Sequence, residues 1–306
     1  MLLLVAYFVF PEQGKNPDAE PESFARQEEP NAPSPQPEAA VSLSLLPAAV
    51  IQGEPARIAI QGVGSPSDIE SLTFDGKQLP VFADAHTVGA LVGIDFHKKP
   101  GSYPIVLTLK NGRTIEEKFD IGERLVATEK FDIPEQLGGN TSEAEHKLSS
   151  SLAEDTTLIQ RVLATTASEK LWEGPFRLPL DGALTITDVY GYKRQTGSVS
   201  LSHQGTDFRA SEGTPVYAMN QGRVAFSGTF RNYGETVIID HGLGLMTFYM
   251  HLSKREKEKG ESVEKGDLIA KSGNTGYSLG PHLHLSVRIN GFSIDPMKFL
   301  ELMGPK

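Results

Sequence analysis

The sequence LGPHLHLSV at residues 279–287 predicts the element around which the rest of the fold is built. Residues i and i+2 of a β-strand point to the same face of a sheet, so His282 and His284 are expected to lie side by side. The apolar residues that alternate with them are expected to face a core on the other side. The Gly-Pro pair before them predicts a turn that leads into the strand. Two imidazoles on one rigid strand indicate a metal site or a proton-transfer site, which we favour over a purely structural role.

The sequence SHQGTDF at residues 202–208 supplies two more potential ligands, His203 and Asp207. The Gly-Thr pair between them favours a turn that leads into a strand, and such a turn can direct both side chains to one point. His203, Asp207 and His284 therefore form a predicted ligand set, with His282 beside them. Three protein ligands leave one tetrahedral position for water, which is typical of a catalytic zinc site. Imidazole and carboxylate ligands suit zinc, and iron or nickel remain open.

Two further histidines follow strand-like runs. His251 comes after a stretch in which Met246, Phe248 and Met250 alternate with other residues, so it is expected to face away from those three. His241 precedes a glycine at a predicted strand end, for which we favour a structural role.

Composition and charge limit the classes of function. The chain has 306 residues, which is enough for two ordinary domains, and a formal net charge of −10 that arises almost entirely before residue 173. An acidic chain without a basic stripe argues against nucleic acid as a partner. There is no cysteine, so any metal must be held by His, Asp or Glu.

The amino-terminal region has the composition of an exported protein. Residues 1–10 are all apolar or aromatic, about half of the roughly 20 that a spanning helix needs, and we interpret them as the remnant of a secretion signal or membrane anchor. Residues 11–40 are rich in proline and acidic residues, which predicts a disordered linker. This order predicts a protein of the cell envelope or periplasm, possessing an inner-membrane anchor if the apolar segment is retained.

The sequence pattern of the remaining chain predicts a mainly β structure. Residues 41–133 have a period of two with turn signals at Asp75-Gly76 and Asn111-Gly112, which predicts a small Ig-like β-sandwich without chemistry of its own. Residues 141–172 have helical periodicity, which predicts a connecting helix that ends before Gly174-Pro175. Residues 173–306 contain short strands separated by glycines, which predicts an all-β carboxy-terminal domain.

Three motifs together resemble those of the M23 peptidases, the lysostaphin-like or LytM zinc metallopeptidases. They are His203-x-x-x-Asp207, Tyr249-x-His251-Leu252 and His282-x-His284, and the resemblance covers roughly residues 176–300. It implies a LytM-like peptidase fold for residues 173–306 and one zinc ion bound by His203, Asp207 and His284. It also implies that His251 and His282 are the catalytic pair.

The sequence departs from the family pattern at a few positions. Leu285 and Ser286 stand where the family often has Phe and Glu, and Tyr190 stands before Gly191 where the family often has Phe. These positions bear on packing and on the walls of the groove, so they affect substrate preference rather than metal binding.

The resemblance implies a zinc-dependent endopeptidase that hydrolyses peptide bonds in the stem peptides or cross-links of peptidoglycan. His282 is the predicted general base, and His251 is predicted to stabilise the developing oxyanion or to protonate the leaving amine, although the two roles can be exchanged.

Two other functions remain open. A non-enzymatic LytM-like module would activate or dock another cell-wall hydrolase, but such modules have usually lost ligands that this chain keeps. A metal-storage or sensing protein would leave His251 and His282 without a purpose. The β-sandwich and the helix are candidates for an inhibitor of the groove, or for a surface that binds the cell wall or an envelope protein.

Overall fold

The computed structural model describes residues 40–84, 87–130, 139–196 and 199–305. The predicted signal or anchor at residues 1–10 and nearly all of the predicted linker at 11–40 lie outside the described residues. Within the described ranges, neither helix combines the length and the apolar character that crossing a membrane requires.

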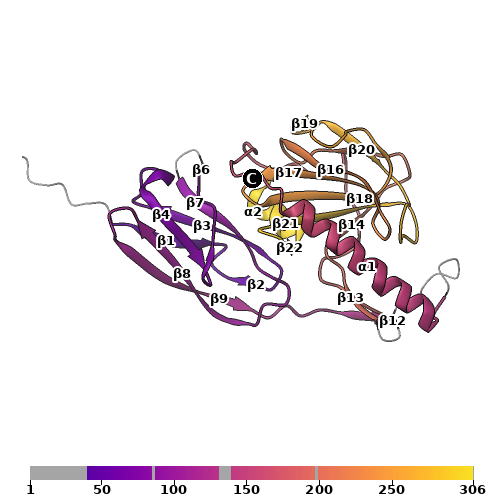
Figure 1. Cartoon of the computed structure of the whole chain (residues 1–306), viewed down its shortest axis with the longest axis horizontal. Coiled ribbons are helices and arrows are strands. Elements are labelled where there is room, and N and C mark those ends of the chain that lie inside the picture. Colours follow the sequence, from indigo (N-terminus) through magenta and orange to yellow (C-terminus); the bar gives the residue numbers. More distant parts are fainter. Residues whose placement is uncertain (1–39, 85–86, 131–138, 197–198, 306) are drawn as a thin grey trace, which may run out of the picture. The chain divides into compact units, whose positions relative to one another are not determined.

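Two sheets form the amino-terminal domain (Figure 1). One has four strands in the order β1 (Ser42–Leu46), β3 (Pro55–Gln61), β7 (Thr87–Gly93) and β6 (Phe82–Asp84). The other has five strands in the order β2 (Val50–Ile51), β9 (Thr114–Gly122), β8 (Gly101–Leu109), β4 (Ile69–Phe74) and β5 (Lys77–Gln78). A short 3₁₀ helix, η1 (Pro66–Asp68), precedes β4. Apolar side chains from both sheets share one buried cluster that includes Ile58, Leu72, Ile105 and Leu107, as in a sandwich.

The two predicted hairpin turns of this domain are present. Asp75 and Gly76 join β4 to β5 with φ angles of 48° and 72°. Asn111 and Gly112 join β8 to β9. Glycine and aspartate tolerate such left-handed conformations, which is why the dipeptides were informative in the sequence.

A ten-stranded sheet dominates the carboxy-terminal domain. Its main path runs β11 (Ile186–Asp188), β14 (Thr206–Arg209), β21 (His282–Ile289), β18 (Leu245–Arg255), β17 (Gly234–Gly242), β16 (Gly222–Phe230) and β19 (Ser262–Val263). Three further strands join it off this path: β15 (Pro215–Tyr217), β20 (Leu268–Ser272) and β22 (Phe292–Ile294). A separate three-stranded sheet contains β10 (Thr128–Lys130), β12 (Lys193–Thr196) and β13 (Val199–Ser202). The mainly β prediction is confirmed.

The two faces of the large sheet have different roles. Leu283, Leu285, Val287 and Ile289 of β21 point into the main core, where they join the carboxy-terminal helix α2 (Pro296–Met303) through Phe299. The other face of β21 carries the residues between them, including both predicted histidines. The alternation in the sequence therefore assigned the faces of β21 correctly.

Helix α1 (Ser142–Leu163) packs on the face that carries the histidines (Figure 1). Ile159 belongs to a cluster with residues of β16, β17 and β18, namely Phe230, Ile238, Met246, Phe248 and Met250. The helix ends at Leu163, earlier than the sequence predicted. Beyond its end, Ala167 N and Thr166 Oγ1 donate hydrogen bonds to the Asp240 carboxylate, which directs the chain away from the helix axis.

A buried carboxylate fixes α1 to the sheet. Asp155 is 2% exposed and accepts hydrogen bonds from the backbone N–H groups of Arg231 and Asn232 at 3.1 and 2.8 Å and from Asn232 Nδ2 at 2.8 Å. Ser151 adds a hydrogen bond of 3.1 Å to Asn232 Oδ1. The helix is therefore anchored at the turn between β16 and β17 by polar contacts as well as by apolar packing.

Replacing Asp155 with alanine is expected to destabilise the protein by about 3 kcal/mol, because two buried donors of Asn232 and the partly buried N–H of Arg231 lose their acceptor. Urea unfolding measures the change. Glu154→Ala, at an exposed neighbour in the same helix, is the matched control and should lie within about 0.5 kcal/mol of the wild type. Equal stabilities for the two variants would contradict the anchoring role of Asp155.

His241 has the structural role that the sequence favoured. Its ring is fully buried, with Nδ1 2.8 Å from the carbonyl of Gln221 and Nε2 2.8 Å from Thr247 Oγ1. The carbonyl can only accept, so Nδ1 carries the proton. Burial lowers the pKa of His241 to about 4.

The lowered pKa predicts a dependence of stability on pH. The unfolded chain binds this proton below about pH 6.5, whereas the folded chain resists it down to about pH 4. The stabilisation is therefore complete above pH 6.5, and about 3 kcal/mol of it is lost as the pH falls toward 4. Urea unfolding of the wild type and of His241→Gln between pH 7 and 4.5 should give a shallower pH dependence for the variant. Parallel curves would contradict this assignment.

Candidate metal centre and active site

Three predicted ligands converge on one point. His203 Nε2 lies 3.1 Å from Asp207 Oδ1 and 3.0 Å from His284 Nδ1, and His284 Nδ1 lies 2.7 Å from Asp207 Oδ1. Two imidazole nitrogens and one carboxylate oxygen thus form a triangle that can hold a metal ion. In a tetrahedral zinc shell with bonds of about 2.0–2.1 Å, neighbouring ligand atoms are about 3.3 Å apart, so the donor set fits zinc with little adjustment.

Strand pairing brings these residues together. Asp207 on β14 lies directly opposite His284 on β21 in the antiparallel register. His203 follows β13, and its neighbour Gly205 lies against the ring of His284 so closely that a Cβ at position 205 would overlap Nε2. A side chain at Gly205 would therefore displace a ligand, which explains the glycine in this turn.

Hydrogen bonds and burial set the protonation of the ligands. His203 Nδ1 donates to the carbonyl of Val189 at 3.0 Å, which leaves Nε2 as the free ligand atom. Burial favours a neutral Asp207, but the close contacts of its carboxylate with His203 and His284 outweigh burial and lower the pKa of this carboxyl. The same carboxylate raises the pKa of His203 against the effect of burial, so His203 must be deprotonated at Nε2 when an ion binds. Burial also lowers the pKa of His284. A charged carboxylate beside a neutral imidazole is the state that binds a divalent ion.

His251 faces the metal cluster, and the prediction that it faces away from Met246, Phe248 and Met250 is wrong. Its ring centroid lies 4.8 Å from that of His282 and 5.9 Å from that of His284. The backbone of His251 has a φ of 58°, and the register of β18 shifts just beyond it. This left-handed residue breaks the alternation of the strand and redirects the side chain toward the other histidines.

Main-chain contacts hold His251 in this strained conformation. Its backbone N–H donates to the carbonyl of Tyr233 at 2.9 Å, and its Nδ1 lies 2.7 Å from the carbonyl of Thr275. The carbonyl requires a proton on Nδ1, so Nε2 is the unprotonated nitrogen of the neutral ring. Burial lowers the pKa of His251 to about 3.

His282 has the same tautomer. Its Nδ1 lies 2.8 Å from the carbonyl of Gly280, and its Nε2 lies 3.8 Å from Asp207 Oδ2. The side chain is 16% exposed, which is more than either histidine ligand. The structure thus brings all five predicted residues together, three as a ligand set and two as imidazoles that present Nε2 beside it.

Sequence reasoning missed the residues that orient these side chains. Thr275 supplies the carbonyl for His251 and also donates from Oγ1 to the carbonyl of Leu252 at 2.7 Å. Val189 and Gly280 act through their carbonyls, for which side-chain identity gives no signal. The glycines on either side of Thr275 and at position 205 were the one visible sign that backbone approaches closely here.

Comparisons with known proteins agree with this geometry. Residues 201–296 match Peptidase family M23. The peptidoglycan DD-endopeptidase ShyB of Vibrio cholerae is 34% identical over 204 residues, which cover 61% of this chain and 46% of that protein. A metalloprotease of Haemophilus influenzae is 40% identical over 135 residues, covering 42% of this chain and 28% of that one. A solved peptidase M23 from Pseudomonas aeruginosa superposes with a TM-score of 0.60 at 27% identity and covers 82% of this chain and 94% of that one.

The carboxy-terminal domain has the fold and the ligand geometry of the LytM-like metallopeptidases. Residues 201–296 of the chain form a domain of Peptidase family M23, as the three motifs predicted. The chain spans about half or less of the length of the curated relatives described above. Family and donor set together confirm the predicted zinc cofactor.

Proposed function

We propose that this chain is a zinc-dependent endopeptidase that hydrolyses peptide bonds in the stem peptides or cross-links of peptidoglycan, and that it acts in the cell envelope or periplasm. The observation that carries the proposal is the convergence of a complete ligand set with two imidazoles that each hold a backbone carbonyl at Nδ1. Relatives named as peptidoglycan DD-endopeptidases support the choice of substrate.

His203, Asp207 and His284 would hold the ion. Bound there, zinc supplies a Lewis acid that polarises a carbonyl and makes water more acidic near neutral pH. The remaining chemistry falls to the two imidazoles, because the nearby carboxylate of Asp188 faces Nδ1 of His203, at 3.8 Å, and not its ligand atom Nε2.

We assign the general base to His282, because its unprotonated Nε2 lies beside the ligand cluster and its side chain is the more accessible of the pair. His251 would then stabilise the developing oxyanion or protonate the leaving amine, and for either role its Nε2 must first gain the proton that His282 takes from the attacking water. Both rings present Nε2 beside the ligand cluster, so the reverse assignment, with His251 as the base and His282 in the other role, fits the same geometry.

The test uses the purified full chain and isolated sacculi. Mass spectrometry of the released fragments should show new products with zinc present, and a chelator should remove them. The bond that is cut follows from the masses of the fragments. A preparation that retains zinc but releases no muropeptide would favour the alternative of a non-enzymatic module that activates or docks another hydrolase.

A further inference from the structure

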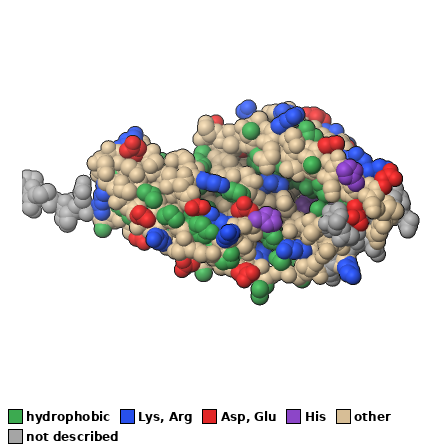
Figure 2. All heavy atoms as spheres, turned by 60° about the horizontal axis from the view of Figure 1, so that its bottom comes forward, with side chains coloured by type: hydrophobic (Ala, Val, Ile, Leu, Met, Phe, Trp, Pro, Cys, Tyr) green, Lys and Arg blue, Asp and Glu red, His purple; other side chains and the backbone are tan. Residues whose placement is uncertain are grey.

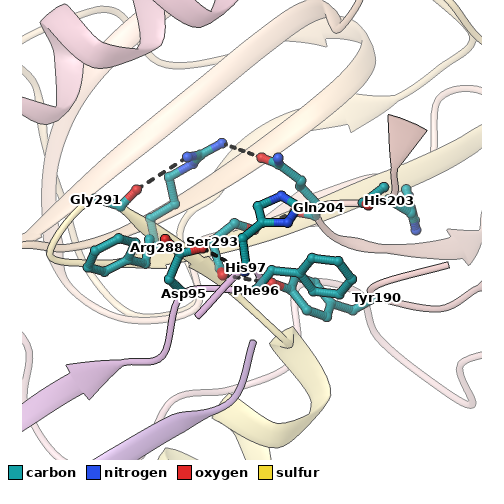
Figure 3. A pocket seen from close by; sticks show the side chains of 11 residues that line it. Asp95, Phe96, His97, Tyr190, His203, Gln204, Arg288, Gly291 and Ser293 are labelled. Atoms are coloured by element: carbon teal, nitrogen blue, oxygen red, sulfur yellow. Dashed lines mark hydrogen bonds between the residues drawn. The ribbon is translucent and has the colours of Figure 1, made fainter. Parts of the chain in front are cut away.

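A polar pocket opens beside the metal ligand His203 (Figure 3). It encloses about 130 Å³, which is enough for a small polar group. Its walls come from the turn before β14, from the end of β21 and from β22, and one of its sides is formed by the 95–97 loop. Four polar residues among those that line it are His203, Gln204, Arg288 and Asp95.

Arg288 is a buried cation without a matching anion. It is 9% exposed, and it donates one hydrogen bond of 3.1 Å from Nη2 to Gln204 Oε1 and one of 3.4 Å from Nη1 to the carbonyl of Gly291 (Figure 3). Its Nε has no hydrogen-bond partner. Among the described residues, no carboxylate is ion-paired with it.

A guanidinium has five N–H donors, and two neutral acceptors satisfy only part of that capacity. A buried charge is unfavourable unless it is paired and hydrogen-bonded. The ring of Phe248, 5.3 Å from the guanidinium carbon, offers weak compensation. The neighbouring residue on the same face of β21 is Ser286, whose hydroxyl donates a hydrogen bond to the carbonyl of Gln204. Ser286 is neutral, so it does not balance the positive charge of Arg288.

The position of Arg288 links the pocket to the catalytic centre. Arg288 lies on the same face of β21 as His282 and His284, and His203 borders both the pocket and the metal cluster. An extended peptide that crosses the metal cluster can therefore place one of its groups in the pocket. Asp95 also borders the pocket, but its Oδ1 accepts the backbone N–H of His97 at 2.9 Å, and its carboxylate is not ion-paired with Arg288.

We propose that Arg288, with Gln204, forms a subsite for a free carboxylate of the peptide substrate. The guanidinium would give two N–H groups to the two carboxylate oxygens, a pairing for which its planar fork is suited. The inference rests on the proposed peptidase function and adds one element of substrate recognition to it. Arg288 is then a specificity-determining residue that does not take part in bond cleavage.

The test compares matched substrates. Disaccharide-peptide dimers are prepared with their carboxyl groups free, and in further preparations with each carboxyl converted in turn to a carboxamide. The wild-type chain should prefer the free carboxylate at one position by about 10- to 100-fold in kcat/KM, mainly through KM. Arg288→Gln should lose this preference, so that its kcat/KM for the free-carboxylate substrate falls toward its own value for the carboxamide. Arg288→Lys should keep part of the preference, because it retains the charge but loses the fork.

Controls separate the subsite from the proposed function and from folding. Arg223→Gln, at an exposed arginine of β16, should keep the full preference. Binding of the same substrates to a His282→Ala chain with and without Arg288→Gln gives the preference without turnover, and circular dichroism checks that each variant folds. If Arg288→Gln fails to fold, the Arg288→Lys comparison decides.

Three results would overturn the subsite. They are a wild type that treats all substrates equally, a preference that survives in folded Arg288→Gln, or a preference that Arg223→Gln also removes. In the first case, hydrolysis of every substrate would leave the proposed peptidase function intact. If the wild type hydrolyses none of them, the proposed function fails, and the binding comparison still decides the subsite.

Discussion

Replacing Asp207 with alanine is expected to abolish both metal retention and hydrolysis, with a loss of activity of at least about 1,000-fold. Its Oδ1 is the atom nearest to both imidazole ligands, at 3.1 Å from His203 and 2.7 Å from His284. Without this carboxylate the ion loses one of three protein ligands and the only negative charge among them. Metal content by mass spectrometry and release of muropeptides from sacculi measure the two effects.

His284→Ala should behave in the same way, because it removes a second ligand of the same ion. Asp120→Ala, at an exposed position of β9, is the matched control and should retain zinc and activity. A folded Asp207→Ala chain that binds one zinc ion and hydrolyses its substrate at the wild-type rate would show that the ligand set is wrongly assigned.

The second large effect concerns the imidazoles that do not bind the metal. His282→Ala is expected to keep one zinc ion and to lose about 100- to 10,000-fold in kcat, since it removes the proposed proton acceptor and leaves the ligand triangle in place. His251→Ala should also keep the metal and lose activity within the same range. Zinc stoichiometry and single-turnover hydrolysis, measured on the same preparations, separate the two properties.

His146→Ala is the control for this pair, because His146 is exposed on the first turn of α1 and lies outside the cluster. If His282→Ala lost its zinc, the residue would be a ligand rather than a base. If neither His282→Ala nor His251→Ala lowered turnover, the proton transfers would have to be carried out elsewhere.

The residues of the site could be predicted from the sequence because most of them lie on regular strands. The alternation of β21 placed His282 and His284 on one face, and the turn before β14 directed His203 and Asp207 together. The same logic failed at His251, since a φ of 58° reverses its side chain and nothing in the residue type indicates this. Local periodicity predicts side-chain direction only as long as the backbone stays regular.

The packing of α1 could be predicted only in part. Its apolar stripe indicated a helix that packs on a domain, but the buried contact between Asp155 and Asn232 joins residues 77 apart in the chain. Long-range polar contacts of this kind leave no local pattern. The same holds for Arg288, whose missing partner becomes visible only when its neighbours in space are known.

Figure 2 shows acidic and basic side chains interspersed over one face of the molecule. The contribution of the β-sandwich, as an inhibitor or as a surface for the cell wall or an envelope protein, stays a prediction. Equal activity of the whole chain and of residues 173–306 alone would argue against an inhibitor.

Anomalous diffraction from crystals of the zinc-loaded chain, recorded at the zinc absorption edge, would locate the ion itself. We expect one strong peak within bonding distance of His203 Nε2, Asp207 Oδ1 and His284 Nδ1, with His251 and His282 close by but not coordinated. A peak coordinated by His251 or His282 in place of one of these ligands, or located away from the cluster, would contradict this expectation.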